Sequence, residues 1–388
     1  MAWSFLKKQG DFAITGSVLV LDIRSSSVAG AIVEFSKNKL PLISQTHREH
    51  YYFESVVEPE EFFKRSETAL KKVLDILLHK HNHQAPVASV EVFFGAPWYQ
   101  ASIANVKIEQ TKPTECTDEF IDAIIKKDTS YDAEADVRVE KELIATLLNG
   151  YKVEQPIGKQ ATHFDFSFFT SVIAKETYTD FITIIKKYVR TPTIYTHTHP
   201  YAMLRVLDNA LHAPRHYAIM DISGEMIELS IIKDDHFKKI ISIPYGSHHF
   251  VRAYAKLLSI DMPTALMKLN NAVHDAVDEK IRTTQQRFLK DIHTDMTAAV
   301  QKVFNAHSIE LLPNVIFVAG DEEVRDLALY LLNEVEIYSG AFKINRKPTV
   351  QFIASDILKT YCAYAANARP DHQLAAEAVF VELLRVDK

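Results

Sequence analysis

Two segments of this sequence share one pattern: an apolar strand ends in an aspartate, and a tight turn leads into a second apolar strand. The first runs from Leu19 to Phe35 and reads LVLDIRSSSVAGAIVEF. The second reads HYAIMDISGEMIELSIIK and places its aspartate at Asp221, in the second half of the chain. A carboxylate at the end of a buried strand, followed by small hydroxyl side chains, is suited to holding phosphate groups and their metal ion. This internal repeat constrains the fold more than any other feature, because the 388 residues are enough for two sizeable lobes.

Glycine is scarce, with 10 glycines in 388 residues, whereas an average usage of roughly 7% would give about 27. Loops that cradle phosphates use glycine because their backbone N–H groups must approach the anion without a side chain in the way. In the first turn, Arg24 stands where such loops normally have glycine. The composition therefore argues against two intact phosphate loops.

The remaining composition is typical of a globular protein, with 47% hydrophobic and 24% charged residues. The net charge of -6 argues against nucleic acid as a partner. Cys116 and Cys362 make neither a disulfide framework nor a thiolate zinc site, which favours the reducing cytoplasm. No apolar run approaches the ~18 residues of a membrane helix, and the lysines of MAWSFLKKQGDF follow its apolar stretch, which is not the order of a signal peptide.

The hydrophobic pattern predicts an α/β chain with an inserted module. Strands are expected near 17–24, 28–36 and 41–53. The stretch EPEEFFKRSETALKKVLDILLHKH then predicts a helix with one buried face, because its apolar residues recur at 62/63, 69/70, 73/74 and 77/78. Alternating residues, an amphipathic helix after Thr117 and a long apolar strand then indicate a small α+β module. The predicted units are 1–99 (first half of lobe 1), 100–175 (the inserted α+β subdomain), 176–215 (return to lobe 1 and crossover), 216–345 (lobe 2, with helices near 247–310) and 346–388 (a C-terminal segment that closes lobe 1).

The two aspartate hairpins and the later strand–turn–helix VIFVAGDEEV resemble the phosphate and adenosine loops of the actin-like ATPase superfamily. The inserted phrase LLNGYKVEQPIGKQATHFDFSFFTSVIA narrows the resemblance to the bacterial FtsA and PilM type, and IPYGSHHFVRAYAKLLSI keeps the spacing of these families. The resemblance covers nearly the whole chain, from about Phe5 to Val386. The opening FLKK and the end after AAEAVFVELLRV look more like PilM, of type IV pilus assembly. FtsA usually adds a linker and a membrane-binding amphipathic helix.

The resemblance implies an actin-like (RNase H-like) fold of two lobes around a cleft, with an SHS2-like inserted subdomain. In the superfamily the first aspartate helps to position Mg²⁺, usually through water, and the small hydroxyl residues reach the phosphates of ATP. ATP and Mg²⁺ are therefore the implied cofactors, with Asp22 and Asp221 as the residues that would position the metal. The implied nucleotide-binding residues are Asp22, Arg24, Ser25, Ser26, Asp221, Gly224, Lys268 and Gly320.

The first loop departs from the family pattern at Arg24, where the family has glycine, and at Ala29, where PilM relatives commonly have lysine. Two orientations of the Arg24 side chain are open. The guanidinium could point into the cleft and pair with a phosphate, or it could point away and close the hairpin. We favour the second orientation.

The other contact regions differ from the family as well. Glu225 places a negative charge where the β- and γ-phosphates should lie, and like charges at ~4 Å repel by about 4 kcal/mol at an effective dielectric constant of 20. The adenosine loop has Ala319–Gly320 in place of two glycines, and Ala265 stands in place of the ribose-contacting glutamate. Changes at every wall of one pocket predict weak or lost ATP binding. The fold should persist, because apolar patterning and not these loops determines it.

Histidines form three weaker signals. His79, His81 and His83 share a face only in an extended chain, so we interpret them as a solvated helix end and not as a metal site. The pairs at 197/199 and 248/249 are interpreted as surface or inter-lobe packing. The sequence contains no nucleophile elbow, P-loop or Cys/His triad pattern.

We therefore expect a cytoplasmic scaffold of the PilM/FtsA type without an enzymatic role. The resemblance implies that it binds the cytoplasmic tail of an inner-membrane pilus-assembly protein, and lies at the inner membrane through that partner. Such a tail would dock as an extended strand or short motif in a groove between the first lobe and residues 100–175. The alternative is an active, ATP-binding, filament-forming protein of cell division or pilus assembly, which Glu225 and Ala265 disfavour. A sugar-kinase-like enzyme is a third hypothesis, which the inserted module disfavours.

Overall fold

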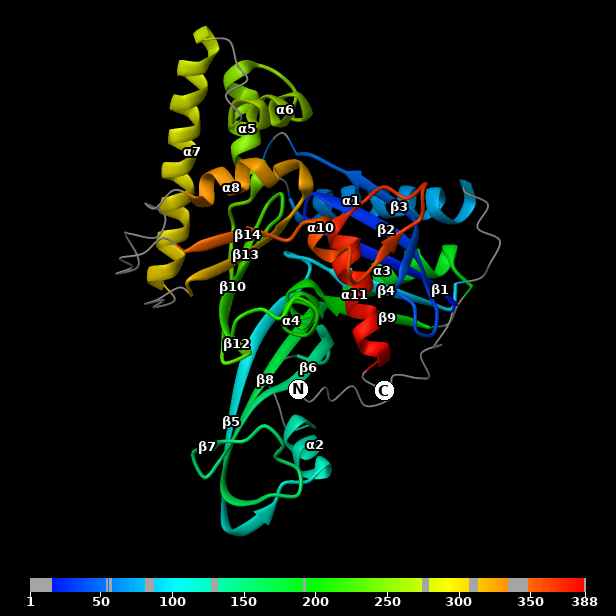
Figure 1. Cartoon of the computed structure of the whole chain (residues 1–388), viewed down its shortest axis with the longest axis vertical. Helices are drawn as coiled ribbons and strands as arrows, with labels where there is room; N and C mark the ends of the chain where they lie inside the picture. Colours follow the sequence, from blue (N-terminus) through cyan, green and yellow to red (C-terminus); the bar gives the residue numbers. More distant parts are fainter. Residues whose placement is uncertain are drawn as a thin grey trace.

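The computed structural model describes residues 16–53, 55, 58–80, 87–126, 132–190, 193–273, 279–306, 313–333 and 348–386. Within these ranges the strands form three sheets (Figure 1). A six-stranded sheet has the order β15-β3-β2-β1-β4-β9, a five-stranded sheet has the order β12-β11-β10-β13-β14, and a four-stranded sheet has the order β5-β8-β6-β7. We call the first two, with their helices, the first and second lobe, and the third the inserted subdomain.

The first lobe is built around β1 (Gly16–Ile23), which pairs antiparallel with β2 (Ser27–Phe35) and parallel with β4 (Ser89–Phe94). Successive residues of β1 point to opposite faces of the sheet. Leu19 and Leu21 pack on the side of α1 and α3, whereas Val18 and Val20 pack on the side of α4 and α11. Because both faces are covered, the strand is apolar throughout. The other elements of this lobe are β3 (Leu42–His50), β9 (Ile194–Thr198), β15 (Ala363–Tyr364), α1 (Pro59–Leu74, continued by a π-helical segment Asp75–Lys80), α3 (Lys175–Tyr188), α4 (His199–Asn209) and α11 (His372–Val386).

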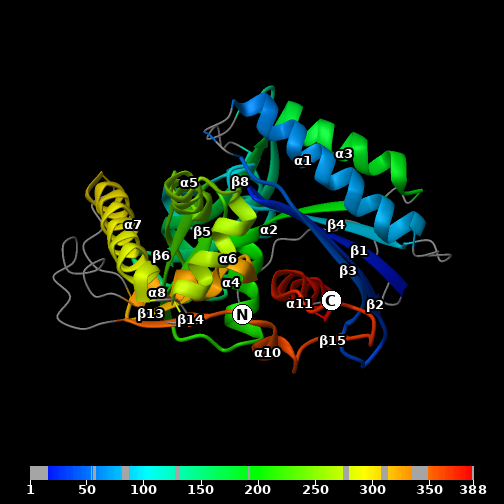
Figure 2. The same cartoon turned by 90° about the horizontal axis from the view of Figure 1, so that it is seen from above.

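Figure 2 shows α1 and α3 side by side on one face of this sheet and α11 on the other. Helix α11 is apolar on nearly every side, and Leu374, Ala378 and Val381 are fully buried. This helix therefore belongs to the core, where it packs between the first sheet and α4.

The second lobe repeats the strand order of the first. Strand β10 (His216–Ile222) pairs antiparallel with β11 (Ile227–Lys233) and parallel with β13 (Val315–Gly320). Asp22 and Asp221 are both the last residue but one of their strands, so the two hairpins are structurally equivalent. The other elements are β12 (His236–Ile243), β14 (Thr349–Phe352), α5 (Ser247–Leu258), α6 (Met262–Val273), α7 (Glu279–Ala306), a 3₁₀ turn (Glu322–Val324), α8 (Arg325–Asn333) and α10 (Ser355–Leu358).

The inserted subdomain extends away from the two lobes in Figure 1. It consists of β5 (Gln100–Glu115), α2 (Asp118–Lys126), β6 (Asp136–Leu148), β7 (Tyr151–Lys152) and β8 (Gln160–Ala174). Alternate phenylalanines of β8, at 164, 166 and 168, pack against Ile121 and Ile124 of α2. The backbone N–H of Phe120 donates to the Thr117 hydroxyl at 3.2 Å, which confirms the predicted cap.

One local prediction differs from the structure. The third strand ends at His50 and not at 53, because Tyr51 leaves the sheet: its hydroxyl donates to the carbonyl of Arg24 and bonds Ser66. The helix predicted for the stretch that starts at Glu58 is confirmed and begins at Pro59, where a proline needs no N–H partner. Most of the His79–His83 group lies outside the described residues. None of the described helices is long and apolar enough to cross a membrane.

Candidate functional site

The two aspartate hairpins meet where the lobes join, and Arg24 lies between them. Its Nε is 2.9 Å from both carboxylate oxygens of Asp22, and its Nη1 is 2.9 and 3.0 Å from those of Asp221. The Arg24 side chain is only 1% exposed, and both aspartates are buried. The guanidinium thus points into the junction, and the favoured prediction that it points away was wrong. Two buried carboxylates need a cation, and the guanidinium bonds both of them, through Nε to Asp22 and through Nη1 to Asp221, while its Nη2 has no hydrogen-bond partner among the described residues.

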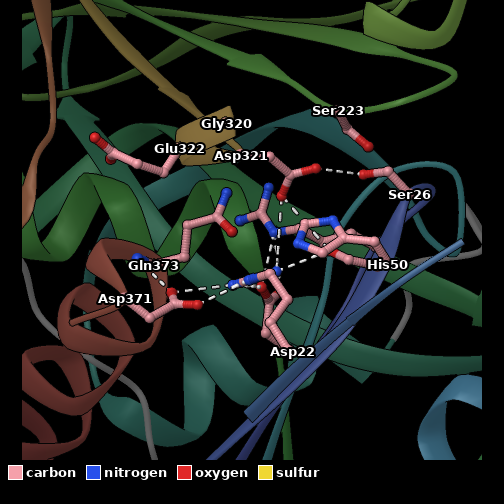
Figure 3. A network of polar contacts seen from close by, with 12 residues as sticks. Asp22, Ser26, His50, Ser223, Gly320, Asp321, Glu322, Asp371 and Gln373 are labelled. Atoms are coloured by element: carbon pink, nitrogen blue, oxygen red, sulfur yellow. Dashed lines mark hydrogen bonds and ion pairs between the residues drawn. The ribbon is translucent and has the colours of Figure 1, made fainter. Parts of the chain in front are cut away.

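A second arginine, Arg48 of β3, joins the same cluster from the side of α11. Its guanidinium contacts Asp371 through Nε at 2.8 Å and Nη2 at 3.0 Å, and Nη2 also lies 3.1 Å from Asp22. Nη1 donates to the Ser27 hydroxyl at 2.8 Å and lies 3.7 Å from Asp321. Figure 3 shows the carboxylates of Asp22, Asp321 and Asp371 pointing toward a shared centre. We call Arg24, Arg48, Asp22, Asp221, Asp321 and Asp371 the junction cluster.

The serines that were expected to bind phosphates instead bind the opposite lobe. The Ser25 hydroxyl is hydrogen bonded to the hydroxyl of Ser223. The Ser26 hydroxyl donates to Asp321 at 2.6 Å (Figure 3). A Cβ added to Gly224 would lie 2.7 Å from the Ser26 Cβ, so the two loops are in direct contact there. As the loops stand, these residues do not fit the phosphates of a nucleotide, because protein atoms fill the space between them.

Glu225 lies beside the cluster but is paired elsewhere. Its carboxylate accepts from Arg252 of α5 at 2.7 and 2.9 Å, and His248 Nδ1 lies 3.1 Å away. Burial alone would raise the pKa of Glu225, but hydrogen bonds from His248 and Arg252 lower it to about 2. Arg252 therefore offsets the negative charge that was predicted to repel phosphates, and the sequence analysis missed this arginine.

The other predicted nucleotide residues are divided between the cluster and the rest of the lobe. Gly320 ends β13 with φ +155, and an added Cβ would lie 2.5 Å from the carbonyl oxygen of Ile222, so this position requires glycine. The next residue, Asp321, belongs to the cluster. Lys268 lies on α6 and takes part in none of the ion pairs that the described residues form with the cluster.

The predicted role of Asp22 and Asp221 in positioning Mg²⁺ does not fit the arrangement of these two carboxylates. Arg24 occupies the position between the two carboxylates that a cation would take. Among the described residues, no group of three or more His, Cys, Asp or Glu side chains is arranged to hold a metal ion. Two carboxylates already bridged by a guanidinium do not fit a resident Mg²⁺.

The two histidine pairs were interpreted as surface residues or as inter-lobe packing, and the structure places His197, His199 and His248 in buried positions. His199 Nδ1 lies 3.1 Å from Asp221, and His197 Nε2 lies 2.9 Å from the fully buried Glu91. His248 packs between the lobes, with its ring 5.2 Å from that of Tyr52. Inter-lobe packing thus describes His248 and His199, whereas His197 is a buried partner within the first lobe.

Electrostatics in the junction cluster follows from burial and pairing. Burial would raise the pKa of Asp221, but Arg24 and His199 hold it well below its usual range. Arg48 likewise holds the pKa of Asp371 well below its usual range against the effect of burial. Glu377 of α11 is the exception: burial and the neighbouring Asp22 raise its pKa well above the usual value. The junction cluster is thus held by pairs of arginine and aspartate beside one carboxyl whose charged form is disfavoured by burial.

Several of these residues were not identified from the sequence. Glu377 could have been identified, because it is the lone charged residue in the apolar run LAAEAVFV. A carboxyl in a buried helix is costly, and its presence indicates polar partners in the interior. Arg48 and Asp371 could not have been identified in this way, since each stands in a polar stretch of the kind that is typical of a protein surface.

A groove of about 540 Å³ opens next to the cluster. Its aromatic wall includes Phe62 and Trp98, whose ring centroids are 4.9 Å apart. Trp98 Nε1 donates to the Arg24 carbonyl at 3.2 Å. A residue that lines the groove is therefore in direct contact with a residue of the junction cluster. The lining comes from all three units: Pro59, Phe62, Phe63, Pro97, Trp98, Tyr99 and Thr177 of the first lobe and its connection, Gln100, Asp136, Val172 and Ala174 of the inserted subdomain, and Glu225, Pro244 and His249 of the second lobe.

Comparison with known proteins gives a result for the fold. No protein-family model and no curated protein matches the sequence. PilM of the PilM–PilN type IV pilus biogenesis complex is similar in structure with a TM-score of 0.61 and 15% identity, over 96% of this chain and 99% of that chain. MreB 5 of Spiroplasma citri bound to AMPPNP has a TM-score of 0.48 and 10% identity, over 96% of this chain and 98% of that one. EutJ of Carboxydothermus hydrogenoformans has a TM-score of 0.44 and 10% identity, over 96% of this chain and 90% of that chain.

The fold is actin-like. The similarity to PilM extends over nearly the full length of both chains, and the two-lobed class predicted from the sequence is confirmed. The inserted sheet of residues 100–174 is part of the aligned chain, because 96% of the residues are covered.

Proposed function

We propose that this protein is a PilM-like assembly protein that binds a short segment of a pilus-assembly partner in the groove beside α1, and that it does so without ATP. The observation that carries the proposal is the apolar groove, present on a fold that PilM shares. The solved structure of PilM is a complex with PilN, a second protein of type IV pilus biogenesis. The partner proposed here is of the same type: the cytoplasmic tail of an inner-membrane pilus-assembly protein.

The groove has the size and chemistry for a peptide segment. Its volume of about 540 Å³ lies within the ~300–1,000 Å³ that binding pockets usually have. Phe62, Phe63 and Trp98 offer an apolar wall, on which aliphatic or aromatic side chains would be removed from water. Gln100 and Asp136 also line the groove and offer oxygen atoms that can accept from the backbone N–H groups of an extended chain. This combination favours a few apolar residues in extended conformation and not a small charged metabolite.

Independence from ATP is supported by the contacts of the junction cluster. Nucleotide phosphates would have to displace Arg24 from two carboxylates. They would also have to separate Ser25 from Ser223 and Ser26 from Asp321. Each of these contacts is buried, so their loss would leave polar groups without partners inside the protein.

The partner proposal is tested by pull-down with the cytoplasmic tail of the PilN-type protein from the same organism. We expect the wild type to retain the tail. Val172→Glu and Phe63→Glu, which place a charge on the apolar lining, should reduce retention at least tenfold. Tyr151→Glu is the matched control, because Tyr151 is 78% exposed at the β6–β7 turn and lies outside the groove. Equal retention by the groove variants and the control would contradict the proposal.

The nucleotide proposal is tested by calorimetric titration with ATP and Mg²⁺, with Asp22→Ala as a control. We expect no binding heat up to millimolar ATP for the wild type. Micromolar binding that is lost in Asp22→Ala would instead support an active, ATP-binding, filament-forming protein, and nucleotide-dependent light scattering would then reveal polymers.

A further inference from the structure

The groove exists only while the two lobes are in contact. Phe62 and Trp98 belong to the first lobe and its connection, whereas Glu225 and His249 belong to the second lobe. Rotation of one lobe away from the other would separate these walls. Whatever holds the lobes together therefore also determines the shape of the groove.

Arg24 touches both the second lobe and the groove wall. Its side chain bonds Asp221 of β10, while its carbonyl accepts from Trp98 Nε1 and from the Tyr51 hydroxyl. The adjacent Ser25 hydroxyl accepts from the backbone N–H of Glu225, which also lines the groove. Residues 24 and 25 thus connect the inter-lobe ion pair to both sides of the groove.

We infer that Arg24 is a built-in tie that keeps the lobes closed and so holds the groove ready for its peptide, in a structure whose loops leave no space for phosphates. The inference rests on the proposed function, since it concerns the regulation of the same groove. Without Arg24, the carboxylates of Asp22 and Asp221 would face each other across the junction as like charges, which repel.

The neighbouring cations cannot replace this tie. Arg48 also contacts Asp22, but its strongest pair is with Asp371, at the start of α11. His199 contacts Asp221, but it belongs to α4 and burial lowers its pKa, which disfavours its charged form. Other hydrogen bonds between the lobes, such as those from Ser26 to Asp321 and from Tyr99 to Glu228, do not involve Arg24 and limit how far the lobes can separate. Each lobe also has a hydrophobic core of its own, which should keep an Arg24 variant folded when the lobes move apart.

The test measures the distance between the lobes with spin labels at Lys71→Cys on α1 and Lys256→Cys on α5, both exposed positions. The native Cys116 and Cys362 are buried and should not react with the spin label. The protein without the introduced cysteines is the control for this, because it should take up no label. We expect one narrow distance for the wild type, unchanged by ATP and Mg²⁺. Arg24→Ala should give a longer and broader distribution, and Arg24→Lys should lie between the two, because an ammonium cannot bond both carboxylates in the same geometry.

Trp98 provides a second readout that needs no partner. The chain has two tryptophans, so Trp3→Phe leaves Trp98 as the only tryptophan, whose emission is followed by selective excitation of the indole. Arg24→Ala should shift its emission to the red, because Trp98 loses the ordered Arg24 carbonyl and gains water. Asp221→Asn keeps the shape of the side chain but removes its charge, and should move both readouts in the same direction. Circular dichroism verifies that each variant is folded.

Unchanged distances and unchanged emission in folded Arg24→Ala and Asp221→Asn would overturn the inference. The proposed function fails separately. If the lobes open in Arg24→Ala but the wild type retains no PilN-type tail, then the tie exists and the partner proposal is wrong. If the wild type and Arg24→Ala retain the tail equally and the distances do not change, then the partner proposal stands and the tie is wrong.

Discussion

Replacement of Arg48 by methionine should lower the free energy of unfolding by about 1–5 kcal/mol at pH 7, because the part-buried ion pair with Asp371 lies between an exposed pair and a fully buried pair that loses one partner. The structure gives the reason. Arg48 is the main cation beside Asp371, at 2.8 and 3.0 Å, and it also contacts Asp22 at 3.1 Å. Methionine keeps most of the apolar volume of the arginine stem, so the cost comes chiefly from the largely buried carboxylate of Asp371, which loses its cation and keeps only the backbone N–H donors of Gln373 and Leu374.

The size of this effect should depend on pH. Arg48 holds the pKa of Asp371 below its value in the unfolded chain, which is about 3.9. Such a depressed group stabilises the fold above pH ~4, and the stabilisation is lost as the pH falls through the folded pKa. In Arg48→Met, burial raises the pKa of Asp371, so the variant regains a neutral side chain as the pH falls. The difference between wild type and variant should therefore shrink between pH 7 and pH 4.5.

Urea unfolding followed by circular dichroism at pH 7 and pH 4.5 measures this difference. Lys72→Met is the matched control, because Lys72 pairs with Glu49 at 2.6 Å but is 55% exposed. Exposed pairs contribute only about 0.2–1 kcal/mol. A cost for Arg48→Met of less than about 1 kcal/mol at pH 7, or an equal cost at both pH values, would refute the reasoning, since either result would mean that Asp371 does not depend on this cation.

Three further predictions concern other parts of the fold. Burial raises the pKa of Glu228 to about 8, so the folded chain holds a proton that the unfolded chain releases and stability should fall as the pH rises from about 5 to 8. Glu228→Gln should remove this slope, of at most about 1.4 kcal/mol per pH unit, in thermal unfolding at several pH values; equal slopes would contradict the assignment. Gly246→Ala should lower the unfolding temperature, because the new Cβ would lie 2.4 Å from two backbone carbonyl oxygens of the second phosphate-type loop; an unchanged temperature would show that this loop can move. Cys116 and Cys362 should react with thiol reagents only after unfolding, because both are buried and burial raises the pKa of each thiol to about 11; labelling of the native protein would refute this.

The parts of the fold that were predictable depend on local pattern. The strand at Leu19 to Ile23 is apolar at every position but Asp22, because its sheet is covered on both faces, and an uninterrupted apolar run of that length indicates such a strand. The repeat of this run before Asp221 indicated a second lobe of the same kind. Residues 164–168, which alternate phenylalanine with polar residues, indicated the half-exposed sheet of the inserted subdomain.

The orientation of Arg24 depends on a partner that is distant in sequence. The sequence of the hairpin around Arg24 is compatible with a side chain that points into the junction and with one that points away. The inward orientation is stabilised by the carboxylate of Asp221, which lies 197 positions away in the sequence. The sequence did contain a usable argument that was not applied. If the loops no longer hold a metal ion, the two strand-end carboxylates still meet in the interior, and a cation must then come from the chain itself.

The remaining contacts of the cluster follow from docking between units. Arg252 meets Glu225 because α5 begins beside the second hairpin, and Arg48 meets Asp371 because α11 begins beside β3. Such pairs are set by the angle between elements and not by either segment alone. The sequence therefore identifies the groups that a junction can use, whereas the three-dimensional arrangement decides which of them are paired.

The inter-lobe contact between Arg24 and Asp221 joins two segments of one polypeptide. A bond formed by a dissolved metabolite is occupied according to the concentration of that metabolite, and it empties when the supply falls. Two side chains of the same molecule meet at an effective concentration that the fold sets and that dilution cannot change. The fraction of molecules in which this contact is formed should therefore be the same in a starved and a well-fed cell, and in dilute and concentrated solutions of the purified protein.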